Sequence, residues 1–185
     1  MKVNLGCGKN YIPGFVHVDL DDLPHIDYKS DIMSLPFFDD NSASLIYSSH
    51  ALAYFDRKEV NTVLSEWYRV LEPEGTLRIA VPDFEAIVKI YKKYGNLDRQ
   101  GILGPLYGFW SQNSSGGSEN TIYHRTTYDF LSLKNVLIKN GFKHPKRYDW
   151  RATIHKEYDD FSQAYIPHMD KENGILISLN VEAKK

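Results

Sequence analysis

The first residues that could do chemistry are the glycines of Gly6-Cys7-Gly8, which follow an apolar stretch around Val3 and Leu5. This pattern predicts a short buried strand that ends in a sharp turn. A Gly-x-Gly turn lets backbone N–H groups approach a ligand closely, because no Cβ stands in the way. In an open parallel sheet, ligands bind outside the carboxyl ends of the strands. The turn therefore indicates a ligand site, although a tight turn without a ligand has the same sequence.

Two carboxylates follow the next two predicted strands. Asp19 comes after the apolar residues 15–18, at the place where a nucleotide ribose is held through its hydroxyls. Asp31 follows the alternating residues 25–29, and an Asx turn is the structural alternative for its side chain. The dinucleotide fingerprint is incomplete, because Tyr11 stands where its third glycine belongs, and the chain has no phosphate-loop motif. The glycine turn therefore suits a nucleoside that carries something other than a diphosphate.

Two histidines are the candidate acid–base groups. His50 follows the predicted fourth strand, residues 41–47, and so faces the same edge as the glycine turn. A neutral imidazole can act as a general base near pH 7, but His50 could equally cap the next helix or contact the ligand. His124 is the second candidate, in a donor-rich cluster whose alternative role is structural. Cys7 has no histidine in register to activate it and is predicted to fill the turn.

Taken together, these segments resemble a class I S-adenosylmethionine-dependent methyltransferase, and more narrowly a bacterial, type 11-like branch. The resemblance implies S-adenosylmethionine as the cofactor, with Asp31 at the adenine. It rests on Val3-Asn-Leu-Gly-Cys-Gly8, Val18-Asp19, Asp31-Ile-Met-Ser-Leu-Pro-Phe37, Ser48-Ser-His50 and Tyr123-His-Arg-Thr126. The cofactor-binding residues that it implies are Leu5, Gly6, Cys7, Gly8, Asp19, Leu20, Asp31, Ile32, Ser48, Ser49 and His50.

The chain departs from the family where relatives commonly have Leu-Glu-His. Here the residues are Leu52-Ala53-Tyr54, which removes a carboxylate and an imidazole from the rim of the pocket. The expected activity is methyl transfer to a small acceptor, and the resemblance makes a sugar or glycan intermediate the leading candidate. The departure keeps open a protein that binds the cofactor without transferring a methyl group. A nucleotide-sugar or nicotinamide enzyme is a further alternative.

Substrate contacts are expected from segments beyond the fifth strand. Asp83 ends that strand, residues 76–81, where it can cap the next helix or lie beside a substrate cleft. Residues from about 97 to 128 are predicted to form a lid or substrate insertion, with a mobile tip at 112–120. A local apolar core is the alternative for its aromatic residues. The candidate substrate residues are Tyr54, Asp83, Trp110, Tyr123, His124, Arg125 and Tyr128, with His50 and His124 as the candidate catalytic residues.

The elements that must position these residues follow from periodicity. Residues 57–71 are predicted as a helix with Asp56 and Glu59 as capping-box partners, and residues 72–75 as the turn that follows it. Residues 84–94 and 130–140 are the next helices, the latter capped by Thr126 or Thr127. The apolar positions of these helices are Val60, Val63, Leu64, Trp67, Val70 and Leu71 in the first and Leu131, Leu133, Leu137 and Ile138 in the last.

Residues 142–150 and 173–183 look like a closing pair of strands. The second of them alternates Ile175, Ile177, Leu179 and Val181 with more polar residues, which is typical of a half-buried strand. The connecting residues 151–171 have no clear period and either wrap the sheet edge or contribute to substrate choice. The expected fold class is α/β: a doubly wound, mostly parallel seven-stranded, Rossmann-like sheet with an antiparallel C-terminal strand.

Length and composition limit the other classes of function. A chain of 185 residues favours one domain, here residues 1–185. A net charge of −2 without a long basic run argues against a nucleic-acid partner and favours a small-molecule substrate. No stretch has the length of a membrane span, no signal-peptide layout is visible, and a single cysteine fits a reducing cytoplasm. No metal-ligand spacing is seen, and the sequence leaves the oligomeric state open.

Overall fold

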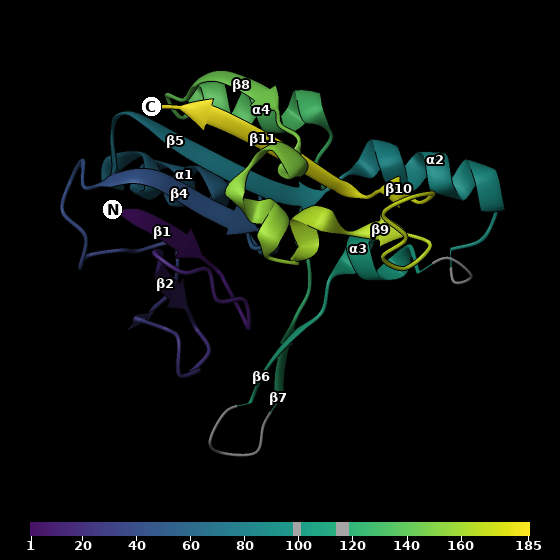
Figure 1. Cartoon of the computed structure of the whole chain (residues 1–185), viewed down its shortest axis with the longest axis horizontal. Helices are drawn as coiled ribbons and strands as arrows, with labels where there is room; N and C mark the ends of the chain where they lie inside the picture. Colours follow the sequence, from purple (N-terminus) through teal and green to yellow (C-terminus); the bar gives the residue numbers. More distant parts are fainter. Residues whose placement is uncertain (98–100, 114–118) are drawn as a thin grey trace.

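Seven strands form the central sheet of the computed structural model, which describes residues 1–97, 101–113 and 119–185, without the side chains of 110–120 (Figure 1). They are β1 (Lys2–Leu5), β2 (Val16–Asp19), β3 (Tyr28–Lys29), β4 (Ala43–Ser49), β5 (Leu71–Pro82), β8 (Lys143–Arg147) and β11 (Ser178–Lys184). Their order is β3-β2-β1-β4-β5-β11-β8. Neighbouring strands from β3 to β5 are parallel, and β11 is antiparallel to β5 and β8. The predicted fold class is therefore confirmed.

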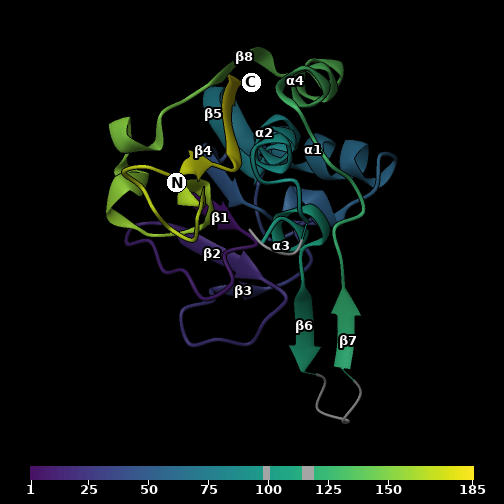
Figure 2. The ribbon, with the colours of Figure 1, turned by 90° about the vertical axis from the view of Figure 1, so that its right-hand side faces the viewer.

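The two faces of the sheet are covered by different kinds of structure (Figure 2). Helices α1 (Glu59–Val70) and α4 (Phe130–Lys139) pack on one face, over the largest hydrophobic cluster. Residues 148–166 cover the other face and contain the short 3-10 helices η2 (Trp150–Ala152), η3 (Ile154–Glu157) and η4 (Phe161–Gln163). On that face the Tyr47 ring of β4 stacks on His155 at 3.8 Å between centroids. The aperiodic segment is thus a layer of the fold.

Helix α1 forms where the periodicity predicts it. Asp56 Oδ1 accepts from the Glu59 N–H at 2.9 Å, and Glu59 Oε2 accepts from the Asp56 N–H at 2.9 Å, so the predicted capping box is confirmed. The Trp67 indole N–H donates to the Ile32 carbonyl at 2.8 Å, which ties the helix to the loop after β3. The predicted apolar stripe is buried throughout: Val60, Val63, Leu64, Trp67, Val70 and Leu71.

The predicted cap of α4 is wrong. Asp129, rather than Thr126 or Thr127, caps the helix, because its Oδ1 accepts from the Ser132 N–H at 2.7 Å. Two of the four apolar positions are also wrong, since Leu131 and Ile138 are 64% and 50% exposed. The helix lies at the edge of the molecule, where a narrower stripe suffices to reach the core. The two positions that do pack in the core are Leu133 and Leu137.

The predicted turn at residues 72–75 is part of β5, which begins at Leu71 directly after α1. Leu71 pairs with Ala43, and a register shift then absorbs the extra residues before Leu45 pairs with Thr76. The second predicted closing strand is divided, because β10 (Ile175–Leu176) pairs with β9 (Tyr165–Ile166), outside the main sheet. Asn180 was expected on a half-exposed face but is buried under η4.

The segment after β5 leads away from the sheet. Helix α2 (Phe84–Tyr94) starts at the predicted cap, Asp83, and ends at Gly95. Helix α3 (Leu103–Tyr107) and the strands β6 (Trp110–Asn113) and β7 (Glu119–Ile122) follow, and this β-hairpin projects from the body of the domain in Figure 1. The predicted tip at 112–120 includes residues 114–118, which lie outside the described residues. In the described parts of the chain, no helix has the length and apolar character of a membrane span.

Candidate active site

Three backbone segments meet at the carboxyl ends of β1, β2 and β3. The Gly6 N–H donates to the Val18 carbonyl at 2.9 Å, and the Gly8 N–H donates to Asp19 Oδ2 at 2.7 Å. The Ser30 N–H donates to the Asp19 carbonyl at 2.9 Å, which places the neighbouring Asp31 at the end of the adjacent strand. The glycine turn and both predicted carboxylates therefore lie at one edge of the sheet.

The two glycines of the turn have different surroundings. Gly6 has φ +66°, and a Cβ placed on it would overlap the Ala51 Cβ, so that β1 and the segment after β4 can approach only because Gly6 has no side chain. Gly8 has φ +53°, and a Cβ placed on it would meet no atom within 4 Å. The turn is therefore closed on the Gly6 side and accessible at Gly8, as a backbone cradle for a ligand requires.

Asp19 has room for a further hydrogen-bond partner. Its side chain is only 7% exposed, and its Oδ1 accepts from the Asp21 N–H at 3.0 Å while its Oδ2 is bound by Gly8. A carboxylate offers about four lone-pair positions, so each oxygen can accept once more. Asp31 is exposed and closes an Asx turn, with its Oδ1 accepting from the Met33 N–H at 2.8 Å. The structural alternative for Asp31 is thus present, and its second oxygen can still accept.

Apolar residues surround this turn. Leu5 and Ile32 are buried, and the Ile32 side chain comes within 3.6 Å of a Cβ placed on Gly6. Leu20 is 37% exposed at the rim. Burial raises the pKa of the Cys7 thiol to about 12, which keeps the thiol neutral. Cys7 therefore fills the turn, as expected, and is not a nucleophile.

His50 leaves β4 in an unusual conformation. Its φ of +58° is in the left-handed region, and its N–H donates to the Ala80 carbonyl at 2.8 Å. Its Nε2 lies 3.1 Å from Ser178 Oγ, and its ring centroid lies 5.4 Å from that of Phe161. Burial lowers the pKa of His50 to about 3, with a further contribution from His124. The imidazole is therefore neutral at pH 7.

His124 approaches from the insertion. Its Nδ1 lies 3.1 Å from the Pro105 carbonyl, which can only accept, so Nδ1 carries the proton. The ring packs edge-on against Tyr54 at 4.7 Å and would collide with a Cβ on Gly108. Burial lowers its pKa below the ordinary value. The charge that His124 would carry when protonated also contributes to the lowered pKa of His50, which lies 74 residues earlier in the sequence.

Comparison with known proteins finds a similarity over the N-terminal part of this site. Residues 6–79 match the family model described as a methyltransferase domain. No curated protein sequence matches the chain. The match covers 74 of the 185 residues, and over this part the chain is similar to a methyltransferase domain. The matched residues include the glycine turn, both carboxylates and His50.

Solved structures of methyltransferases share the fold at low identity. An S-adenosylmethionine-dependent methyltransferase from Archaeoglobus fulgidus is 16% identical with a TM-score of 0.57, and covers 100% of this chain and 85% of its own. A second methyltransferase, from Methanosarcina mazei, is 16% identical with a TM-score of 0.56, and the match covers 100% of this chain and 91% of the other. The 1,6-didemethyltoxoflavin-N1-methyltransferase of Burkholderia thailandensis, solved with S-adenosylhomocysteine, is 13% identical with a TM-score of 0.55, covering 100% and 70%.

Three predicted substrate residues have structural partners elsewhere in the domain. Arg125 forms ion pairs with Asp56 at 2.9 Å and Glu59 at 2.6 Å, across the capping box of α1. Asp83 caps α2 and pairs with an arginine of β8 at 3.0 Å. Tyr128 is 2% exposed and belongs to the main hydrophobic core. These side chains position neighbouring elements, so we leave them out of the proposed substrate site.

Aromatic residues of the insertion remain available to a substrate. Tyr54 is half-buried beside His124, and Tyr123 is 52% exposed with its ring 6.2 Å from Phe109. The side chain of Trp110 lies outside the described residues, although its backbone belongs to β6. Phe161 next to His50 is 64% exposed and was missed, because it lies in the segment without periodicity.

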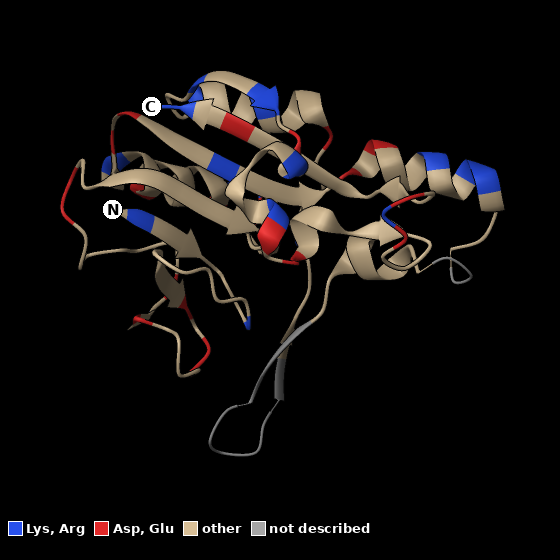
Figure 3. Cartoon of the chain, viewed as in Figure 1, with Lys and Arg blue, Asp and Glu red and all other residues tan. Residues whose placement is uncertain are grey.

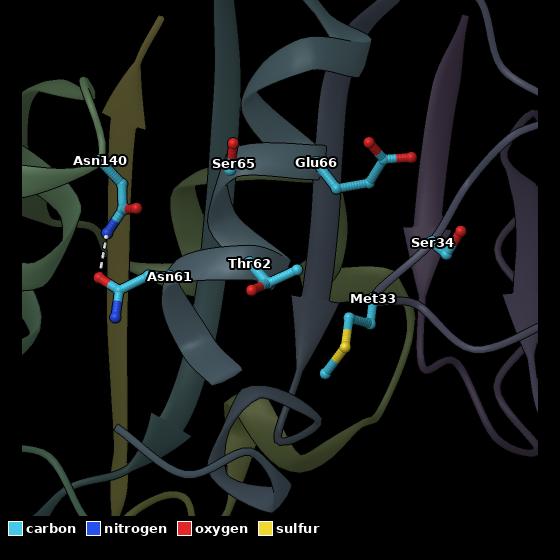
Figure 4. A pocket seen from close by; sticks show the side chains of 7 residues that line it. All are labelled: Met33, Ser34, Asn61, Thr62, Ser65, Glu66 and Asn140. Atoms are coloured by element: carbon cyan, nitrogen blue, oxygen red, sulfur yellow. Dashed lines mark hydrogen bonds between the residues drawn. The ribbon is translucent and has the colours of Figure 1, made fainter. Parts of the chain in front are cut away.

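A depression elsewhere on the surface is not part of this site. It has a volume of about 530 Å³ and lies over the outer face of α1, with Met33 and Ser34 at one side and Asn140 at the other (Figure 4). Asn140 Nδ2 donates to Asn61 Oδ1 across one end of it at 3.2 Å. Its lining is short and polar: Met33, Ser34, Asn61, Thr62, Ser65, Glu66 and Asn140.

Proposed function

We propose that this chain is an S-adenosylmethionine-dependent methyltransferase that methylates an uncharged hydroxyl group, with a sugar or glycan intermediate as the leading acceptor and His50 as the general base. The observation that carries the proposal is the place of His50, which directly follows β4 and precedes Ala51, the residue that lies against Gly6 of the glycine turn. A neutral imidazole can take the proton that a hydroxyl loses when it attacks a methyl group. His50 and His124 are two such groups, from different segments of the chain.

The distribution of charge supports an uncharged acceptor. The cation and the anion that the sequence placed at the substrate, Arg125 and Asp83, are both bound to partners of opposite charge. A carboxylate, phosphate or ammonium acceptor would lose its hydration on binding and needs a counter-ion to replace it. Exposed aromatic faces, such as those of Phe161 and Tyr123, offer instead a surface for the apolar side of a sugar or another ring.

The mechanism makes modest demands on the protein. When bound, S-adenosylmethionine supplies a methyl group on a positively charged sulfur that departs neutral, so no general acid is required. The residues of the site must hold the acceptor oxygen in line with that methyl group, which is catalysis by proximity. His50 takes the proton from the acceptor oxygen, so the positive charge moves within the site and is not created in it. The low pKa of His50 keeps the ring unprotonated at pH 7.

For the cofactor we propose the residues that the resemblance implies, with Asp19 at the ribose hydroxyls. The free positions on its carboxylate support this role, as does the open cradle at Gly8. The insertion at about 97–128 is proposed as the substrate lid of a single domain, residues 1–185. Both Lys or Arg and Asp or Glu are present on the described elements in Figure 3, and the net charge is −2, which supports a small-molecule acceptor over a nucleic acid. We place the reaction in the cytoplasm, where a lone cysteine stays reduced.

Two experiments test the proposal. In calorimetry we expect S-adenosylhomocysteine to bind, and NAD and UDP not to bind, while Gly8→Arg abolishes binding by filling the cradle. Labelled cofactor is then offered to a panel of neutral sugars, phenols, carboxylates and amines. We expect label in a hydroxyl compound, and a much slower transfer with His50→Gln. Transfer to a carboxylate or an amine, or full activity in His50→Gln, would overturn the proposed acceptor or the proposed base respectively.

A further inference from the structure

A buried chain of hydrogen bonds starts at His50 and runs under the layer formed by residues 148–166. His50 Nε2 lies 3.1 Å from Ser178 Oγ, and the Ser178 hydroxyl donates to Asn180 Oδ1 at 2.9 Å. Asn180 Nδ2 donates to the backbone carbonyl of Ser162 at 2.8 Å. Ser178 and Asn180 are 2% and 3% exposed, so water does not compete for these bonds. The chain therefore connects the candidate base to the backbone of η4.

The direction of every bond in the chain is fixed from its far end. The Ser162 carbonyl can only accept, so the amide nitrogen of Asn180 must face it and the amide oxygen must face Ser178. That oxygen can only accept, so the single hydroxyl proton of Ser178 is committed to it. The Ser178 oxygen can then only accept from His50. Nε2 of His50 consequently carries the proton, and Nδ1 is left as its acceptor nitrogen.

The sheet geometry explains how His50 reaches this chain. Ala80 of β5 lies opposite Asn180, and Pro82 lies opposite Ser178, so these residues share one face of the sheet. The left-handed backbone of His50, bonded to the Ala80 carbonyl, directs its ring over β5 to β11. Ala80 has only a methyl group on that face and leaves the path open. The buried serine and asparagine of β11 thus have a defined partner.

We propose that Ser178 and Asn180 are positioning residues that hold His50 in its Nε2–H tautomer, so that Nδ1 is the nitrogen that receives the proton of the acceptor. The consequence for turnover rests on the proposed role of His50 as the base, whereas the tautomer itself can be observed without an acceptor. Without the chain, the ring can rotate and exchange tautomers, and the fraction of correctly oriented base falls.

The tautomer is tested by NMR on the full chain labelled with ¹⁵N-histidine at pH 7.5, with His50→Gln to assign the resonance. We expect His50 to be protonated on Nε2, with that proton protected from solvent exchange. Ser178→Ala should speed its exchange by about tenfold or more, since no oxygen accepts from it. Ser178→Thr keeps the hydroxyl and should retain protection. Ser162→Ala is the matched control, because the chain uses only the Ser162 backbone. A proton on Nδ1, or unchanged exchange in a folded Ser178→Ala protein, would overturn the proposal.

Turnover provides the second readout. With an identified acceptor, Ser178→Ala should lower kcat roughly tenfold, a part of the about 10²- to 10⁴-fold that a general base supplies, and leave the KM for S-adenosylmethionine unchanged. Ser178→Thr should restore kcat. Suppose that His50→Gln retains full turnover and that the wild-type protein shows the protected Nε2 proton of His50. The base role then fails, and the positioning of the ring stands. If His50→Gln loses turnover and Ser178→Ala does not, the positioning role is overturned and the base role stands.

Discussion

The backbone N–H of Gly8 donates to Asp19 Oδ2 at 2.7 Å, and this bond joins the turn after β1 to the end of β2. The glycine that leaves space for the cofactor and the carboxylate proposed for its ribose are therefore one structural unit. A change in either residue should act on the other. Cofactor binding and the geometry of the turn are consequently expected to fail together.

Asp19→Asn should weaken S-adenosylhomocysteine binding by about tenfold or more, measured by calorimetry. The amide loses a charge-assisted hydrogen bond, which is worth about 1.5–3 kcal/mol, and its nitrogen cannot accept from Gly8. Asp22→Asn is the control, because this exposed carboxylate pairs with Lys29 at 3.1 Å and has no contact with the turn. Equal affinity of the Asp19 variant and the control would contradict the proposed ribose site.

Gly6→Ala should destabilise the protein by about 2–4 kcal/mol in denaturant titration. About 1–2 kcal/mol comes from the left-handed conformation and the rest from overlap with Ala51. Gly14→Ala is matched, since Gly14 has φ +78° but open space around it, and should cost only the conformational part. If the two variants are equally stable, a methyl group at position 6 does not overlap Ala51 and the proposed close contact is absent.

His50→Gln should lower kcat for a hydroxyl acceptor by about 10²-fold or more, because the variant lacks the base. His124→Gln should raise the KM for the acceptor more than it lowers kcat, since His124 is the second group beside the proposed base. Steady-state kinetics with both substrates varied separates these effects. The exposed His168→Gln serves as the control and should match the wild type. A larger loss of kcat in His124→Gln than in His50→Gln would reverse the assignment.

His155→Phe should flatten the loss of stability in acid. Burial lowers the pKa of His155 from its ordinary 6.5 to about 3, so the folded state holds the ring neutral. The stabilisation that the neutral ring gives the folded state is complete above pH 6.5. It is lost as the pH falls from 6.5 toward 3, at about 1.4 kcal/mol per pH unit. Phenylalanine keeps the stacking on Tyr47 and has no proton to bind. When the pH is lowered from 7.5 to 5, the free energy of unfolding of the variant should therefore fall by about 2 kcal/mol less than that of the wild type.

Urea titrations at several pH values check this prediction. His168→Phe, at an exposed position, is the control and should keep the slope of the wild type. An unchanged acid slope in the His155 variant would mean that His155 is not held neutral in the fold.

Arg125→Gln should leave the KM for the acceptor and kcat within about twofold of the wild type, because its guanidinium is bound to Asp56 and Glu59. The melting temperature should fall slightly, and less so at high salt, since these ion pairs are exposed and screened. Kinetics and thermal melts of the same samples provide both values. A large rise in the KM for the acceptor would return Arg125 to the substrate site.

The sequence alone determined the local features of this protein. The Gly-x-Gly turn, the acids after β2 and β3, the capping box of α1 and its buried stripe all depend on residues within one or two turns of each other. Their conformations follow from backbone sterics, local hydrogen bonds and periodicity, which are written in short stretches of residues. The fold class followed from the resemblance that these stretches carry, and the structure supplied the order of the strands.

Tertiary structure decided everything that depends on distant partners. Asp129 caps α4 in place of the nearby threonines, and Arg125 is bound to acids 66 and 69 residues earlier in the chain. Ser178 and Asn180 look like the outer face of an edge strand, yet an aperiodic segment buries them and aligns them with His50. No local pattern encodes such contacts, because a buried polar group takes whichever partner the packing of remote segments brings within hydrogen-bond distance.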